Sequence, residues 1–312
     1  MSHTPQEPSK FRAWLYACLD RGYRALRIYV VFALLMYIFQ DQLFYRPITA
    51  TEASADSVAA QLKLTTYTGA ADWKNIAYTP LSTPTAAAST RGTVIVAHGN
   101  ARTALDCYVV SDALTRLGFR VILYEYPGYG ACPGTPTEES IVTPLRKLVR
   151  EVAALGESRI YLFGQSMGCG VVCSALGDKT LPVAGAILLQ PWDKLGKLAD
   201  HHLFIFPCSY MLGEKYNSVA NLAHFTGPVV FAICEKDTTI PPVFSQRLFD
   251  SYTHRKLWYL LPGCDHNDWP AEPDAAWWKA VSDFVAPPTG TGTAQPDHSS
   301  PTASTTAAAA RL

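Results

Sequence analysis

One serine in this chain lies between two glycines, at the point where an apolar run ends. Gly164-Gln165-Ser166-Met167-Gly168 follows residues 159–163, which have the pattern of a buried strand, and residues 167–177 have the pattern of a helix. A G-x-S-x-G turn between strand and helix holds its serine in a strained backbone conformation, and small neighbours permit the tight turn. We therefore predict that Ser166 is a nucleophile, with Gly164 and Gly168 as the glycines of its turn.

A serine hydroxyl needs a base to take its proton and an acid to orient that base. Asp237 follows a predicted strand at 228–234, and His266 follows the last predicted strand, 256–261. The chain order Ser, Asp, His, with the acid and the base each in a loop after a strand, suits this chemistry. We predict that His266 accepts the Ser166 proton and that Asp237 fixes the imidazole.

Three other carboxylates compete with Asp237 for the role of the acid. Glu235 is nearer the strand end, and Asp265 and Asp268 flank His266. A carboxylate next to the histidine in sequence usually points away from its ring, so the pattern favours Asp237 in the loop after the strand. The three competitors are interpreted as loop residues.

Acyl transfer also requires two donors for the negative charge that develops on the substrate oxygen. The backbone N–H of Met167 directly follows the nucleophile, at the start of its helix. The second donor is expected in the loop after residues 93–97, which reads His98-Gly99-Asn100-Ala101. We assign it to the backbone N–H of Asn100, with His98 as a support for the loop rather than a second base.

These loops require a scaffold in which strands alternate with helices. Strands are expected at 62–67, 74–79, 93–97, 120–125, 159–163, 184–189, 228–234 and 256–261, and helices at 103–117, 138–155, 167–177, 242–252 and 274–285, with a mostly helical insertion at 193–223. Such alternation predicts right-handed crossovers and a mostly parallel sheet with helices on both faces.

The amino-terminal part of the chain has a different composition. Residues 28–45 form a mainly apolar run whose only charged residue is Asp41, and five basic residues precede them. This pattern predicts a single-pass membrane anchor with its amino end in the cytoplasm and the catalytic domain on the other side. A buried helix, or a helix lying in the membrane interface, is the alternative.

Three regions follow from this organisation. Residues 1–45 form the basic segment and anchor, residues 46–286 form the catalytic domain with 193–223 as a small cap, and residues 287–312 form a disordered tail. The tail is rich in Pro, Gly, Ser and Thr, and it has too little apolar bulk to offset the entropy of ordering.

Charge and cysteine usage exclude several other functions. Lys plus Arg and Asp plus Glu are 26 each, so there is no basic surplus for binding nucleic acid. The eight cysteines form no C-x-x-C pair and no zinc-ligand spacing with histidine, and they are too sparse for a disulfide scaffold. We predict neither a metal nor a cofactor.

Five motifs together resemble the α/β-hydrolase superfamily. They are HGNA at 98–101, YEYPGYG at 124–130, GQSMG at 164–168, EKDTTIPP at 235–242 and GCDHND at 263–268. More narrowly, they are similar to its membrane-anchored branch, which includes the bud-emergence-type hydrolases and protein depalmitoylases. The resemblance spans residues 40–285 and implies a serine hydrolase acting on carboxylic esters or thioesters through Ser166, Asp237 and His266.

The expected partners are an acyl ester or thioester substrate and a lipid bilayer. Apolar residues at 203–212 in the cap would line an acyl pocket or simply cover the sheet. The same triad would also suit a peptidase or amidase, and a catalytically silent membrane-attached scaffold is a further alternative from another class.

Overall fold

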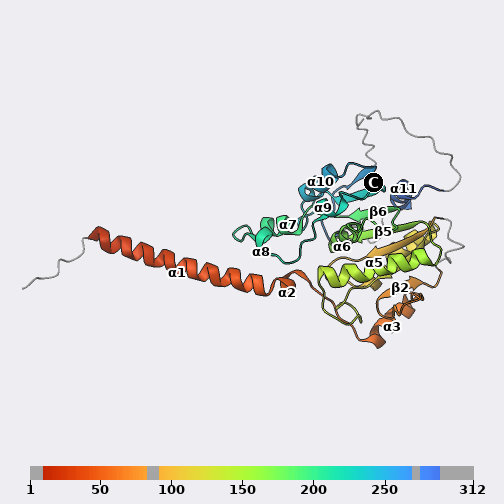
Figure 1. Cartoon of the computed structure of the whole chain (residues 1–312), viewed down its shortest axis with the longest axis horizontal. Helices are drawn as coiled ribbons and strands as arrows, with labels where there is room; N and C mark the ends of the chain where they lie inside the picture. The colour runs from red at the N-terminus through yellow and green to blue at the C-terminus, as the bar shows by residue number, and fades with distance from the viewer. Residues whose placement is uncertain (1–9, 83–90, 269–274, 289–312) are drawn as a thin grey trace, which may run out of the picture.

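An eight-stranded sheet forms the centre of the molecule (Figure 1). The structure, a computed structural model, describes residues 10–82, 91–268 and 275–288. The strands are β1 Leu64–Thr66, β2 Ala77–Pro80, β3 Thr93–Ala97, β4 Arg120–Tyr124, β5 Ile160–Gln165, β6 Gly185–Leu189, β7 Val229–Cys234 and β8 Lys256–Leu261. Their order across the sheet is β1-β2-β4-β3-β5-β6-β7-β8. The pairs β1–β2 and β2–β4 are antiparallel, and all later pairs are parallel.

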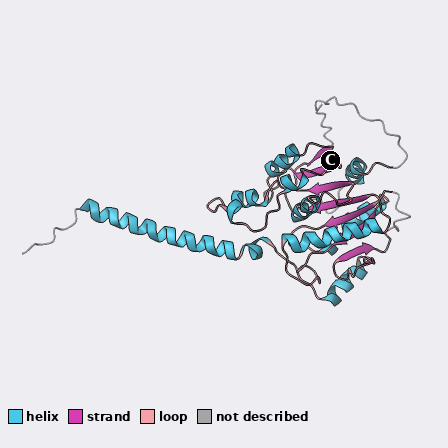
Figure 2. Cartoon of the chain, viewed as in Figure 1, coloured by secondary structure: helices cyan, strands magenta, loops and turns pink. Residues whose placement is uncertain are grey.

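Helices cover both faces of this sheet (Figure 2). One core joins the sheet to α5 Glu138–Ala154, α6 Met167–Leu176 and α10 Pro242–Ser251. The other core joins it to α3 Glu52–Gln61, α4 Tyr108–Arg116 and α11 Ala275–Val285. Strand β3 shows why both layers are needed: Ile95 and Ala97 belong to the first core, whereas Val94 and Val96 belong to the second. The predicted mostly parallel sheet with helices on both faces is confirmed.

Two predicted helical segments are more broken than expected. The segment at 103–117 begins with a short 3₁₀ turn, η1 Ala104–Cys107, before α4. The cap at 193–223 contains three short helices: α7 Leu195–His202, α8 Cys208–Met211 and α9 Ser218–Leu222. Apart from residues 287 and 288, the predicted disordered tail lies outside the described residues.

The prediction of a membrane-spanning anchor is wrong. None of the helices in the described part of the chain is long and apolar enough to cross a membrane. The long helix α1 Lys10–Ile38 is charged over much of its length, and the chain leaves helical geometry at Phe39 before the short α2 Gln40–Phe44. Its charge-free part, residues 28–38, rises about 16 Å, roughly half of a hydrocarbon core about 30 Å thick. The predicted side of the membrane depended on this anchor and has no remaining basis.

Helix α1 also does not pack as a buried helix. It extends away from the sheet, and none of its residues is buried (Figure 1). Helix α1 touches the cap through Tyr29, in its carboxy-terminal half. The Tyr29 hydroxyl donates to the Ile205 carbonyl at 2.9 Å, and the Tyr29 ring stacks on Phe206. The cap and the amino-terminal helix are therefore neighbours, outside the core of the sheet.

Candidate active site

Ser166 occupies a sharp turn between β5 and α6. Its φ of 52° and ψ of −118° place a non-glycine residue in a strained region of backbone space. A side chain at Gly168 would come within 2.2 Å of the Ala97 carbonyl oxygen, and one at Gly164 would come within 2.5 Å of the Gly168 carbonyl oxygen. The two glycines therefore let the turn close against β3 and lift the serine above the end of the sheet.

Three of the residues singled out in the sequence form one hydrogen-bonded chain. Ser166 Oγ lies 2.9 Å from His266 Nε2, and His266 Nδ1 lies 2.8 Å from Asp237 Oδ2. Asp237 is only 4% exposed, and its other oxygen accepts the backbone N–H groups of Thr239 and Ile240 at 2.9 and 2.6 Å. These bonds fix the carboxylate so that one oxygen faces the imidazole.

The competing carboxylates bind backbone rather than the imidazole ring. Asp265 accepts the backbone N–H groups of Thr238 and His266 at 2.8 and 2.7 Å, and these bonds lower the pKa of the Asp265 carboxyl. The Glu235 carboxylate accepts a hydrogen bond from the Gly263 N–H at 2.8 Å. The Asp268 carboxylate accepts a longer one from the Asp265 N–H, at 3.4 Å. Asp265 and Glu235 therefore join the loop that carries Asp237 to the loop that carries His266.

A pocket opens directly at Ser166. Its volume is about 280 Å³, and its lining includes Asn100 and Met167, the two residues predicted to supply oxyanion donors. The lining combines polar residues, including Gln165, Ser166 and His266, with the apolar residues Phe44, Trp192, Leu195 and Leu198. The arrangement can hold a carbonyl group beside the hydroxyl, with an apolar group alongside it.

Comparisons with known proteins agree with this architecture. A family model described as the alpha/beta hydrolase fold matches residues 92–210, which include β3, the serine turn and the first part of the cap. The matched segment and the topology of the sheet identify the same architecture. The chain has the α/β-hydrolase fold. The fold class predicted from the sequence is confirmed.

Curated relatives match only part of the chain. An uncharacterized protein of Mycobacterium tuberculosis is 29% identical over 178 residues, covering 56% of this chain and 63% of the relative. The lysophosphatidylserine lipase ABHD12 of Danio rerio is 26% identical over 181 residues, covering 52% of this chain and 47% of the relative. The chain thus spans less than two thirds of the length of these relatives.

A solved structure shows the same fold. An esterase from Rhodococcus sp. ECU1013 superposes with a TM-score of 0.52 at 16% identity, covering 72% of this chain and 98% of that chain. At this level of identity the similarity establishes the architecture alone.

Cys169 is the other nucleophilic side chain beneath the serine turn of this α/β-hydrolase fold. It is fully buried, and its thiol donates to the carbonyls of Gly164 and Leu189, each at 3.1 Å. Burial raises the pKa of the Cys169 thiol well above its ordinary value, so the group stays neutral. This thiol supports the turn and does not compete with Ser166.

The Asn100 side chain connects the predicted oxyanion loop to the amino-terminal segment. Its amide nitrogen donates to the Phe44 carbonyl at 2.6 Å, and its oxygen accepts from the Arg46 N–H at 2.9 Å. The Tyr129 hydroxyl also donates to this oxygen, at 2.8 Å. Sequence reasoning missed these partners, although Tyr129 lies in YEYPGYG, one of the motifs that carried the family resemblance.

The support beneath the same loop is buried. His98 Nε2 lies 2.8 Å from a Glu125 carboxylate oxygen, with both side chains inaccessible to solvent. The other Glu125 oxygen accepts the Ala104 N–H at 3.0 Å, and the Tyr126 hydroxyl donates to the His98 carbonyl at 2.7 Å. Glu125 thus holds residues on both sides of Asn100, and the His98 ring is buried against Glu125.

Tyr129→Phe is expected to lower kcat by about threefold to tenfold while KM changes little. The substitution removes a hydrogen bond to the Asn100 side chain, so the predicted oxyanion donor, which would act mainly in the transition state, is displaced. Tyr124→Phe is the matched control, because its buried hydroxyl donates to the Ile141 carbonyl at 2.7 Å in another part of the core. Loss of either buried hydrogen bond costs about 1 kcal/mol of stability. An equal fall in kcat for both variants would contradict the positioning role.

A disulfide links the two loops that carry Asp237 and His266. Cys234, at the end of β7, pairs with Cys264, and the two Cα atoms are 5.1 Å apart. The Gln190 side chain reinforces this junction, because its amide nitrogen donates to the His266 carbonyl at 2.8 Å. The spacing of cysteines in the sequence gave no indication of this pair. Asp237 and His266 are therefore held by a covalent link as well as by hydrogen bonds.

No group of side chains in the described residues could hold a metal ion.

Proposed function

We propose that this protein is a serine hydrolase that cleaves a carboxylic ester or thioester through an acyl-enzyme on Ser166. The observation that carries the proposal is the continuous hydrogen-bonded chain from Ser166 through His266 to Asp237. With a proton on Nδ1 bound to Asp237, the free Nε2 lone pair of His266 faces the serine hydroxyl.

The reaction follows from this geometry. His266 takes the Ser166 proton as Oγ attacks the substrate carbonyl, and the Met167 and Asn100 N–H groups stabilise the oxyanion. His266 then donates this proton to the departing alcohol or thiol, and the acyl group remains bound to Ser166 Oγ. A water molecule, deprotonated by His266, releases the acid and restores the serine.

An apolar pocket beside the site favours an acyl-chain substrate. It has a volume of about 150 Å³ and lies between α1–α2 and the cap. It shares Phe44 and Leu195 with the pocket at Ser166. Its remaining lining is almost entirely apolar and comes from both sides: Met36, Tyr37, Gln40, Leu43, Ala199, Leu203, Phe206, Cys208, Met211 and Leu212. The cap residues at 203–212 thus supply part of a pocket that suits a hydrocarbon chain.

The names of two similar proteins agree with ester chemistry. ABHD12 is named a lysophosphatidylserine lipase, and the Rhodococcus protein is named an esterase. The narrower similarity to depalmitoylases makes a thioester the specific alternative within this proposal. A peptidase or amidase would use the same three residues, but the apolar pocket favours an acyl chain. A silent scaffold would not need the hydrogen-bonded chain.

A panel of p-nitrophenyl esters and acyl thioesters of graded chain length tests the proposal. We expect turnover whose kcat/KM rises with chain length and falls once the chain outgrows the pocket. Matched acyl anilides, which carry the amide bond of the alternative, should react more slowly. Absence of turnover with every ester and thioester would contradict the proposal, and faster anilide cleavage would favour the amidase.

We also propose that the protein contacts a lipid surface without spanning it. Large apolar side chains are exposed along α1 and at the adjoining tip of the cap, where Phe204 is 84% exposed. Tyr29 joins these two surfaces through Ile205. Wild-type protein should float with neutral liposomes in a density gradient, and Phe204→Asp should weaken flotation. Wild-type protein that stays at the bottom of the gradient would refute this partner.

A further inference from the structure

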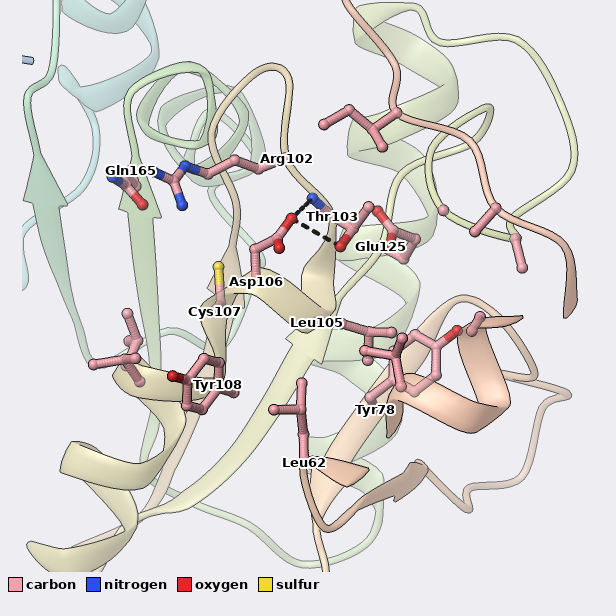
Figure 3. Close-up of a pocket in the computed structure, with 18 of the residues that line it drawn as sticks. Leu62, Tyr78, Arg102, Thr103, Leu105, Asp106, Cys107, Tyr108, Glu125 and Gln165 are labelled. Carbon is pink, nitrogen blue, oxygen red and sulfur yellow. Dashed lines mark hydrogen bonds between the residues drawn. The ribbon is translucent and has the colours of Figure 1, made fainter. Parts of the chain in front are cut away.

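A second, larger pocket adjoins the one at Ser166 (Figure 3). Its volume is about 590 Å³, and it lies between η1–α4 and the segment around α3. The two pockets share four residues, Arg102, Gln165, His266 and Asn267. A molecule bound at Ser166 can therefore extend into this larger space past His266.

The chemistry of the reaction decides which part of a substrate enters it. His266 must give its proton to the leaving group, so the leaving group lies on the side of the site that His266 faces. His266 lines the larger pocket but does not line the apolar pocket beneath the cap. The acyl chain is thus directed towards Phe44 and Leu195, and the departing alcohol or thiol towards the larger pocket.

Arg102 stands at the junction of these two spaces. Its side chain extends towards Gln165, which lines both pockets (Figure 3). No ion pair within 4.0 Å joins its guanidinium to a carboxylate in the described part of the chain. A guanidinium presents several N–H donors in a planar fork that matches the oxygens of a carboxylate or phosphate.

The acidic side chains of the larger pocket have other partners. Asp106 accepts from the N–H of Thr103 at 2.7 Å and from its hydroxyl at 3.0 Å, as the dashed lines in Figure 3 show. Glu125 is buried against His98 and the Ala104 N–H. Both carboxylates therefore have structural roles at η1, and Arg102 is the cation that faces a group passing between the pockets.

We propose that Arg102 pairs with an anionic oxyacid group, a phosphate or a carboxylate, on the leaving group of the substrate. The substrate is then an amphipathic ester or thioester, with an apolar acyl chain on one side of Ser166 and a negative charge on the other. This inference rests on the proposed serine hydrolase function and specifies the substrate class of the same site.

Three esters with one common acyl chain test the inference: monoesters of glycerol, glycerol 3-phosphate and glycerate. For the wild type we expect kcat/KM to be about tenfold higher for an anionic ester than for the neutral one, a modest ratio because Arg102 is exposed. The ratio should approach one in Arg102→Gln and fall below one in Arg102→Glu. Arg116→Gln should keep the wild-type ratio, because Arg116 lines neither pocket and pairs with Asp112 on the surface of α4.

The readout is a ratio within one protein preparation, so a partly unfolded fraction cancels. A preference for the phosphate ester alone, or for the glycerate ester alone, supports the inference and identifies the group. A ratio of one in the wild type, with hydrolysis that depends on Ser166, would overturn this inference and leave the hydrolase function standing. An anionic preference that survives in Arg102→Gln would also overturn it. No cleavage of any of the three, together with none in the p-nitrophenyl panel, would overturn both proposals.

Discussion

Ser166→Ala is expected to lower kcat for ester hydrolysis by about 10⁴-fold to 10⁶-fold. In the proposed mechanism the Ser166 hydroxyl oxygen forms the acyl-enzyme, and without it the rest of the site would supply only binding and oxyanion stabilisation. The thermal midpoint should stay close to that of the wild type, because the alanine keeps the backbone turn. Kinetics on a p-nitrophenyl ester, together with a thermal melt of the same sample, provide the measurement.

Ser166→Gly is the matched control for the strain at this position. The φ of 52° is unfavourable for serine and alanine but accessible to glycine. Relief of about 1–3 kcal/mol of strain outweighs the added entropy of the unfolded chain, so the glycine variant should unfold at a temperature no lower than that of the alanine variant. Both variants should be inactive. Substantial ester hydrolysis by either one would place the nucleophile elsewhere.

Asp237→Asn is expected to lower kcat by about 10⁴-fold. The amide oxygen can still accept the N–H groups of Thr239 and Ile240, which leaves the amide nitrogen facing His266. This nitrogen donates to Nδ1, so the ring carries its proton on Nε2 and can no longer accept the Ser166 proton. Steady-state kinetics across neutral pH should show the loss in kcat, with KM nearly unchanged.

Glu235→Gln is the control for this prediction. Glu235 is two residues away in the same loop, but its carboxylate binds the Gly263 N–H and not the imidazole. We expect its kcat to stay within about threefold of the wild type, because a glutamine oxygen can accept the same bond. If Glu235→Gln were the more damaged variant, the acid would have been assigned to the wrong residue.

The sequence was most informative where local chemistry dictates geometry. A serine between two glycines needs a sharp turn, and in the structure those glycines leave room for nothing larger. Asp237 and His266 each follow a strand of a parallel sheet, so both reach the same edge as the serine. This rule was enough to single out three residues that the structure joins by hydrogen bonds.

The sequence was least informative about contacts between distant segments and about where the amino-terminal helix ends. The disulfide between Cys234 and Cys264 depends on β7 and β8 being neighbours in the sheet. The role of the Asn100 side chain depends on where residues 44–46 lie. The predicted anchor was wrong because hydropathy gives no sign that the helix ends at Ile38, before the apolar run does.

Labelling with a fluorophosphonate probe, followed by mass spectrometry of the peptides, tests the central claim most directly. The probe phosphonylates a serine only when a neighbouring base activates it. We expect one adduct, on Ser166, that is absent in Ser166→Ala and strongly reduced in His266→Ala. An unlabelled wild type, or an adduct on another residue, would contradict the assignment of Ser166 as the nucleophile.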